Sequence, residues 1–158
     1  MTAQPVEPQQ LLVVGDGPVA DALEALASVL GWVTTVAGTT DEVAVALPSS
    51  AAVVVTSHHD DLDAPALALA LADAGETAGP AYVAAMGSRR TQARRREWLV
   101  AHGVTEAALE ALHAPAGLDI GADTPPEIAL SVLAEITQLR YQGTGRPLRD
   151  RAPSRNGS

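Results

Sequence analysis

The first apolar run of the chain leads directly into a glycine turn and then into a helix. The run is Leu11-Leu12-Val13-Val14, and Gly15-Asp16-Gly17-Pro18-Val19-Ala20 follows it. A buried strand that ends in such a turn places backbone N–H groups and the positive end of a helix dipole at one point, where an anion such as a pyrophosphate binds. The first glycine permits the tight turn, and the second lets a phosphate approach the backbone. We therefore predict an anion-binding loop at Gly15, Gly17 and Pro18.

Strands alternate with helices along the rest of the chain. Apolar runs predict strands at residues 11–14, 32–37, 51–56 and 81–85, and helical spacing predicts helices at residues 18–30, 63–74, 89–102, 105–112 and 127–139. Residues 41–47 are expected to be a short acidic connection, and residues 113–123 a glycine-rich loop. The last helix follows a capping box, Thr124-Pro125-Pro126-Glu127. This alternation predicts an α/β fold, a Rossmann-like doubly wound parallel sheet in a single domain.

Composition sets the size of the domain and excludes several chemistries. The chain has 158 residues, of which 47% are hydrophobic, and this is enough for one core. We expect a disordered lead-in at residues 1–10, the domain at residues 11–140 and a flexible tail rich in Arg, Gly and Pro at residues 141–158. The absence of cysteine excludes disulfides and thiolate sites, and the absence of lysine excludes Schiff-base chemistry. No apolar run approaches the length of a membrane span, so a cytoplasmic protein without a membrane partner is expected.

The arginines are confined to two segments. Residues 1–88 contain eleven Asp or Glu and no Arg, five arginines lie in residues 89–96, and the other five lie in residues 140–155. The net charge of −9 argues against a nucleic-acid partner. Arginines at a helix N-terminus oppose the helix dipole unless an anion is bound there. We therefore predict a phosphate site at Gly87, Ser88, Arg89, Arg90 and Thr91, whereas Arg94, Arg95 and Arg96 are expected to form a solvated helix face.

Two other loops are expected to lie beside the Gly15 and Gly87 loops, at the carboxyl ends of the strands. Ligands of parallel sheets bind beyond this edge. Thr56 and His58 follow a strand and are predicted to contact a ligand, and His58 is also a candidate acid or base. We expect His59, Asp60 and Asp61 to form a polar loop whose aspartate caps the next helix rather than a metal site. Asp119 and His113 either complete the cleft or are a capping aspartate and a surface histidine.

The end of the second strand lacks part of the dinucleotide pattern. An acidic residue about 20 positions after the glycines normally binds the ribose hydroxyls. Here the strand is followed by Gly38-Thr39-Thr40, and the nearest acids, Asp41 and Glu42, come a few residues late. No arginine is present to bind a 2′-phosphate, so NAD or NADP is a less favoured cofactor.

Four segments together resemble the carboxy-terminal Rossmann domain of the XdhC/CoxI family, the accessory factors of xanthine dehydrogenase and carbon monoxide dehydrogenase. They are residues 11–20, 56–71, 82–96 and 113–136, and residues 143–148 are similar to the family's tail. The segments Gly87-Ser88-Arg89-Arg90-Thr91 and Gly117-Leu118-Asp119-Ile120-Gly121 are the most specific.

The resemblance implies a role in the maturation of molybdenum hydroxylases. Members bind the molybdenum cofactor (molybdopterin or its nucleotide form), protect it during sulfuration and deliver it to the apo-enzyme. The phosphate of this cofactor would suit the Gly15 loop and residues 88–91, with no catalytic residue required. Full-length members carry an amino-terminal domain with a Gly-Gly-Cys motif, which this sequence lacks. The expected partners are therefore the apo-enzyme and a separate protein of the amino-terminal type. Exposed apolar surface on an edge of a Rossmann fold makes a homodimer a further expectation.

Two alternatives remain open from the residues themselves. The first is a nicotinamide-dependent oxidoreductase, which the glycine loop favours and the missing ribose acid disfavours. The second is a non-catalytic interaction module whose nucleotide site is vestigial.

Overall fold

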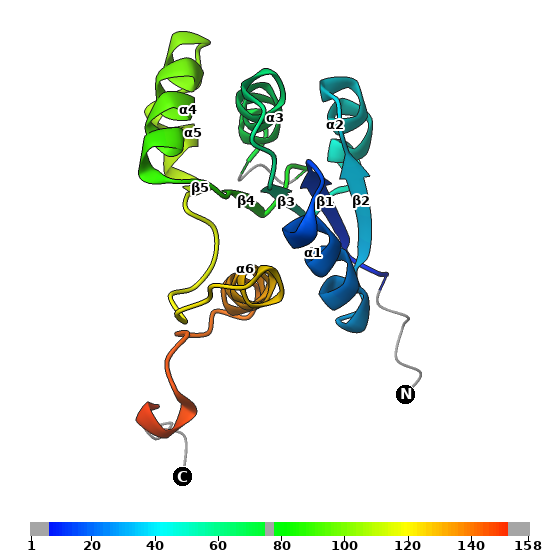
Figure 1. Cartoon of the computed structure of the whole chain (residues 1–158), viewed down its shortest axis with the longest axis vertical. Coiled ribbons are helices and arrows are strands. Elements are labelled where there is room, and N and C mark those ends of the chain that lie inside the picture. The colour runs from blue at the N-terminus through cyan, green and yellow to red at the C-terminus, as the bar shows by residue number, and fades with distance from the viewer. Residues whose placement is uncertain (1–6, 75–77, 152–158) are drawn as a thin grey trace.

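The computed structural model describes residues 7–74 and 78–151 and shows a parallel five-stranded sheet with helices on both faces (Figure 1). The strand order is β2-β1-β3-β4-β5. The order reverses between β1 and β3, which is the topological switch point where ligands bind in such sheets. The strands are β1 (Gln10–Val14), β2 (Val33–Ala37), β3 (Ala52–Val55), β4 (Tyr82–Ala85) and β5 (Leu112–His113). The fold class predicted from the sequence is confirmed.

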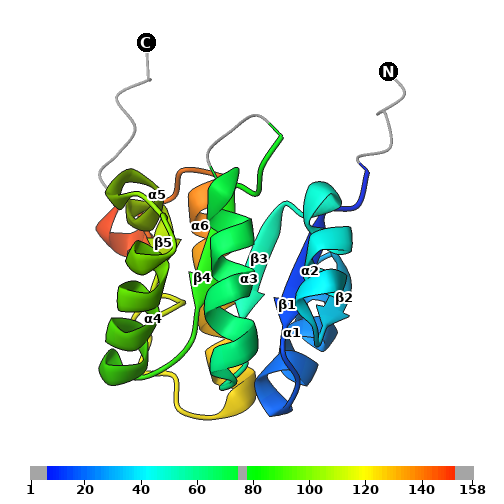
Figure 2. The same cartoon turned by 90° about the horizontal axis from the view of Figure 1, so that it is seen from above.

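The helices form two layers, one on each face of the sheet (Figures 1 and 2). One layer contains α1 (Pro18–Val29) and α6 (Pro125–Arg140), and the other contains α2 (Thr40–Ala46), α3 (Asp60–Ala72), α4 (Arg89–Ala101) and α5 (Glu106–Glu110). Side chains of β1 alternate between the two cores: Leu11 and Val13 pack toward α1 and α6, and Leu12 and Val14 pack toward α3. Burial on both faces explains why the strand sequences are continuous apolar runs.

Three local predictions are wrong. Residues 41–47 are mostly helix α2, whose first turn is fixed by a capping box between Thr39 and Glu42. Strand β5 lies at the start of the predicted loop and pairs with β4. Helix α3 begins at Asp60 rather than Asp63, and no side chain within the described residues caps it. The three acids of its first turn instead face the positive end of the helix dipole.

Arg95 is buried, which contradicts the expectation of a solvated face for this residue. Its side chain is 3% exposed, and its Nη2 lies 2.7 Å from Oδ2 of Asp63, which is 1% exposed. Nη2 also donates to the carbonyl of Ser57 at 3.1 Å, and Nη1 donates to the carbonyl of Met86. Ser57 follows β3 and Met86 follows β4, so this one side chain holds two strand-end loops together.

The two flanking arginines behave as predicted. Arg94 forms an exposed ion pair with Asp60 at 3.0 Å, and Arg96 forms an exposed pair with Glu106. Of the expected lead-in and tail, residues 1–6 and 152–158 lie outside the described residues. No helix within the described residues is long and apolar enough to cross a membrane.

We expect Asp63→Ala to lower the free energy of unfolding by about 3–5 kcal/mol, because it leaves the charge of Arg95 buried without its partner. The matched control is Asp60→Ala, which removes the exposed ion pair with Arg94 between the same two helices. It is expected to cost less than about 1 kcal/mol. Urea unfolding followed by circular dichroism gives both values. Equal losses in the two variants would contradict the role assigned to the buried pair.

Glu127 links stability to pH at the start of α6. Backbone N–H groups of Thr124 and Asp123 donate to its carboxylate and hold the pKa of Glu127 below its usual value. The stabilisation is therefore present above the ordinary pKa of 4.5 and is lost as the pH falls through the lower value of the folded state. We expect Glu127→Gln to lower the melting temperature at neutral pH, and the difference from the wild type to close in acid. A difference that does not change with pH would refute this assignment.

Candidate functional site

Three strand-end loops meet at the carboxyl edge of the sheet. Val14 of β1 pairs with Val55 of β3, which pairs with Ala85 of β4, so the three strands end side by side. Gly15 and Thr56 follow β1 and β3 directly, and Gly87 lies two residues after the end of β4. Figure 2 shows the starts of α1 and α3 near this edge, below the strand arrowheads.

The backbone N–H of Gly15 is not free to bind a ligand, and the glycine instead allows two loops to lie close together. Its N–H donates to the carbonyl of Ala37 at the end of β2, at 2.9 Å. A Cβ at this position would lie only 2.7 Å from the Cβ of Ser57. Glycine is therefore required here because the loop after β1 passes directly against the loop after β3.

The part of the Gly15–Pro18 loop that a ligand can approach is the N-terminus of α1. Gly17 is the N-cap residue with φ of 105°, and no side chain within the described residues caps the helix. A Cβ built on Gly17 meets no atom within 4 Å, so the space next to it is free. Pro18 starts the helix and has no N–H of its own, so the N–H groups of Val19 and Ala20 are the ones available to an anion.

Thr56 and His58 have different surroundings. Thr56 is buried, and its hydroxyl donates to the carbonyl of Val14 at 3.3 Å, so it joins β3 to β1. His58 is exposed at the beginning of the loop that leads to α3. His59 is the N-cap residue of α3, with its own N–H donating to the hydroxyl of Ser57 at 3.0 Å. His58 and His59 are both exposed, so a ligand can reach either side chain, whereas Thr56 is buried.

The second predicted loop caps a helix and exposes two guanidinium groups. The Ser88 hydroxyl accepts from the N–H of Thr91 at 3.2 Å, and the two hydroxyls lie 3.1 Å apart. Arg89 and Arg90 are both exposed in the first turn of α4, where the helix has no acidic residue. Gly87 has φ of 136°, and a Cβ there would lie 3.1 Å from Nη1 of Arg95. The buried arginine therefore also determines the path of this loop.

A carboxylate lies at the end of β2, although its residue, Glu42, comes a few positions later in the sequence than the dinucleotide pattern requires. Glu42 lies on α2, but its side chain turns back, and Oε2 accepts from the N–H of Gly38 at 2.6 Å and of Thr39 at 3.1 Å. A hollow of about 230 Å³ lies next to this strand end, between Gly15, Asp16, Gly38 and His59. The Thr39-x-x-Glu42 spacing was the signal that places this acid, because it is the spacing of a capping box.

Glu135 of α6 forms a polar cluster that sequence analysis missed. One oxygen, Oε2, accepts from the Tyr82 hydroxyl at 2.7 Å and from the N–H of Gly117 at 2.6 Å, and Oε1 lies 2.7 Å from Nδ1 of His113. Burial raises the pKa of Tyr82 far above its ordinary value, and the adjacent carboxylate adds to this effect. The cluster fixes the start of the β5–α6 loop against α6. Asp119, farther along that loop, is exposed.

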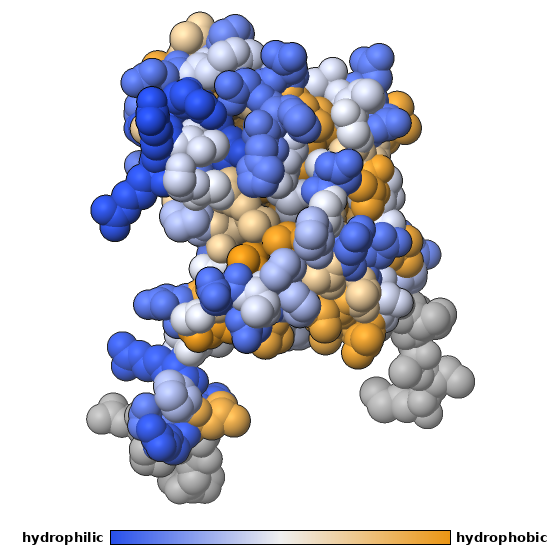
Figure 3. All heavy atoms as spheres, in the orientation of Figure 1, coloured by the Kyte–Doolittle hydropathy of each residue, from blue (hydrophilic) through white to orange (hydrophobic). Residues whose placement is uncertain are grey.

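Hydrophilic and hydrophobic residues lie on different parts of the surface. Hydrophilic residues gather over α4 at the upper left of the view, and hydrophobic residues gather near the lower end of α1 (Figure 3). The exposed arginines of α4 are thus separated from the apolar end of α1. The carboxyl edge of the sheet offers two helix N-termini without a side-chain cap within the described residues, those of α1 and α3, together with two exposed arginines and two exposed histidines. Three acids occupy the first turn of α3, so the start of α1 is the one that suits an anion.

Comparison with known proteins finds a matching family model, a curated protein with a similar segment and solved structures with a similar fold. The model of the XdhC Rossmann domain matches residues 11–136. YqeB, an uncharacterized protein of Escherichia coli K12, is 45% identical over 65 residues, which are 41% of this chain and 12% of YqeB. A Bacillus halodurans protein described as a xanthine dehydrogenase has a solved structure with a TM-score of 0.63 at 20% identity, covering 91% of this chain and 45% of the other.

The structural likeness shows a shared fold, and this chain spans less than half the length of either relative. The family match covers most of the chain, including the strand-end loops that suggested the resemblance. The protein therefore belongs to the family of the XdhC Rossmann domain.

Proposed function

We propose that this protein is an accessory factor in the maturation of molybdenum hydroxylases such as xanthine or carbon monoxide dehydrogenase. In this role it binds a phosphorylated molybdopterin-type cofactor, or its nucleotide form, at the carboxyl edge of the sheet. Membership of the XdhC Rossmann-domain family supports an accessory role. The structural neighbour described as a xanthine dehydrogenase is consistent with the same client class.

The uncapped N-terminus of α1 is the observation that carries the cofactor proposal. The open space beside Gly17 and the N–H groups of the first turn fit a phosphate group. Arg89 and Arg90 add positive charge at the start of α4, where no side-chain acid of the first turn neutralises them. His58 is placed to contact the remainder of the ligand. In this proposal the protein binds and protects the cofactor, and none of its own side chains reacts.

The carboxylate of Glu42 favours NAD(P) as a second candidate ligand. It stands at the end of β2, where dinucleotide folds place the acid that binds the ribose. Its Oε2 is already used by two backbone N–H groups, however, and this leaves less capacity for ribose hydroxyls. We therefore rank a nicotinamide-dependent activity second.

Isothermal calorimetry with a molybdopterin nucleotide, NAD and NADP separates the two candidates. We expect the molybdopterin nucleotide to bind most tightly, and the double variant Arg89→Ala/Arg90→Ala to weaken it about tenfold or more, since hydrogen bonds to charged groups are lost. Both arginines are exposed, so the variant should keep its melting temperature. Arg149→Ala, which removes an exposed arginine far along the chain, is the control and should bind as the wild type does.

Three outcomes count against the proposal. Tighter binding of NAD or NADP would favour the oxidoreductase. Wild-type affinity in the double variant would show that the arginines at the start of α4 do not take part in ligand binding. If the folded wild-type protein binds none of the three ligands, the result would favour the alternative of an interaction module whose nucleotide site is vestigial.

A further inference from the structure

A hollow of about 320 Å³ lies at the edge where the strands begin, opposite the carboxyl edge of the sheet. Its lining includes Gln9 before β1, Trp32 before β2 and Tyr82 at the start of β4, together with Ile136 and Leu139 near the end of α6. In Figure 2 this end of α6, drawn in orange, lies at the opposite edge of the sheet from the start of α3. A hollow of this size with mostly apolar walls suits a small molecule.

The aromatic side chains that line the hollow are held in place by other residues. Tyr82 is buried, its hydroxyl donates to Oε2 of Glu135 at 2.7 Å, and its ring stacks on the ring of His113 with 4.9 Å between the centroids. Trp32 is half-buried, and Cζ of Arg140 lies 5.8 Å from the centre of its ring. The aromatic walls are therefore oriented before any ligand arrives, which lowers the entropic cost of binding an aromatic molecule.

Charge indicates which class of aromatic molecule fits. Among the described residues, Arg140 is the one charged side chain that lines the hollow. It is exposed, and none of the ion pairs between described residues includes it. Gln9 adds an amide that can donate a second hydrogen bond. A guanidinium that no carboxylate neutralises, at the border of an apolar hollow, favours a ligand with a carboxylate of its own.

We propose that this hollow is a second ligand site and that it binds a small aromatic carboxylate. The ring of the ligand packs against Trp32 and the apolar side chains of α6, and its carboxylate accepts hydrogen bonds from Arg140. The hollow lies at the opposite edge of the sheet from the start of α1 and is lined by other residues. The inference is therefore independent of the cofactor proposal.

Heteronuclear NMR of the full chain with hydrocinnamate tests the location of the site. The chain has two tryptophans, and their indole N–H signals report on different places. Trp32 lines the hollow, whereas Trp98 on α4 stacks on His102, across the sheet. We expect the Trp32 signal to shift with a Kd of about 1 mM, as is usual for so small a ligand, and the Trp98 signal to stay in place. The variant Trp98→Phe assigns the two signals.

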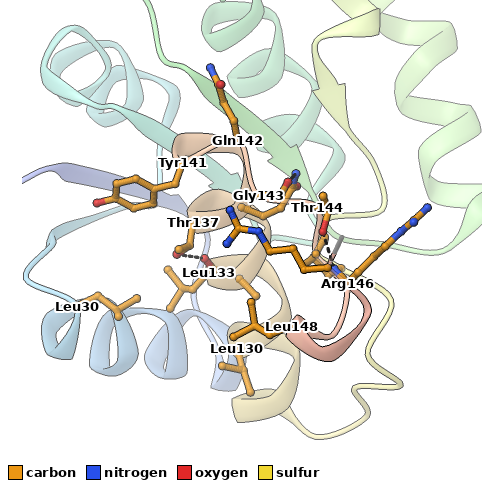
Figure 4. Close-up of a pocket in the computed structure, with 15 residues that line it drawn as sticks. Leu30, Leu130, Leu133, Thr137, Tyr141, Gln142, Gly143, Thr144, Arg146 and Leu148 are labelled. Atoms are coloured by element: carbon orange, nitrogen blue, oxygen red, sulfur yellow. Dashed lines mark hydrogen bonds between the residues drawn. The ribbon is translucent and has the colours of Figure 1, made fainter. Parts of the chain in front are cut away.

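A comparison of hydrocinnamate with its neutral amide tests the recognition of charge. Arg140→Met keeps an apolar stem and removes the guanidinium, so it should weaken hydrocinnamate about tenfold and leave the weaker binding of hydrocinnamamide unchanged. The matched control is Arg146→Met, which should bind both ligands as the wild type does. Arg146 is also exposed, but it borders a separate groove of about 630 Å³ behind α6, beside Leu130 and Leu148 (Figure 4).

A second variant tests the hollow itself without a change of charge. Ala81 lines the hollow and is exposed, so Ala81→Leu should keep the fold, reduce the free space and weaken the acid and the amide alike. A Trp32 signal that does not move at about 20 mM hydrocinnamate, well above the expected Kd, would overturn the proposal. Equal shifts of both indole signals would overturn it too, as would an amide that binds as tightly as the acid or an equal loss of affinity in the Arg146 variant.

Discussion

The buried ion pair between Arg95 and Asp63 is the interaction on which the carboxyl edge of the sheet depends. Two opposite charges in the interior are tolerated only when their hydrogen bonds are largely satisfied. Arg95 meets most of this requirement by donating to the carbonyls of Ser57 and Met86 as well as to Asp63. Within the described residues, its Nε and Oδ1 of Asp63 are buried without a hydrogen-bond partner. The carbonyls of Ser57 and Met86 belong to loops after two adjacent strands. The buried charge of Arg95 therefore pairs with Asp63 and also holds the loops after β3 and β4, which border the candidate site.

Close backbone contacts complete the arrangement. Gly15 lets the loop after β1 lie against Ser57, and Gly87 lets the loop after β4 pass over the guanidinium of Arg95. Ser57 is therefore held from both sides, by a glycine of the first loop and by the arginine of α4. The result is a rigid strand-end edge on which the N-termini of α1 and α4 are positioned before any ligand arrives. Such preorganisation lowers the entropic cost of binding.

The sequence predicted the architecture well because the buried strands and capped helices have strong local patterns. The apolar runs at β1 and β3 and the capping box of α6 determined strands and helix within one or two residues. Short elements had no such pattern: β5 has two residues, and α2 was hidden in an acidic stretch. The role of Gly15 as a close contact with Ser57 also depends on residues 42 positions away, which no local pattern reveals.

The burial of individual charged residues was even harder to predict from local sequence patterns. Arg94, Arg95 and Arg96 are consecutive and chemically identical, yet the middle one is buried and the others are exposed. Only the path of α3, which brings Asp63 beneath α4, distinguishes them. The Glu135 cluster likewise joins β4, β5 and α6, and Glu135 is 53 residues from Tyr82 and 22 residues from His113 along the chain. The predicted phosphate loops remain a prediction that rests on the exposed N-termini and on family membership.

A crystal structure of the protein with a molybdopterin nucleotide would show whether the carboxyl edge of the sheet is the binding site. We expect the phosphate group to lie against the N–H groups of Val19 and Ala20 beside Gly17, with Arg89 or Arg90 in contact with the ligand. A nucleotide bound away from this edge, for example behind α6 beside Leu130 and Leu148, would contradict the proposed site.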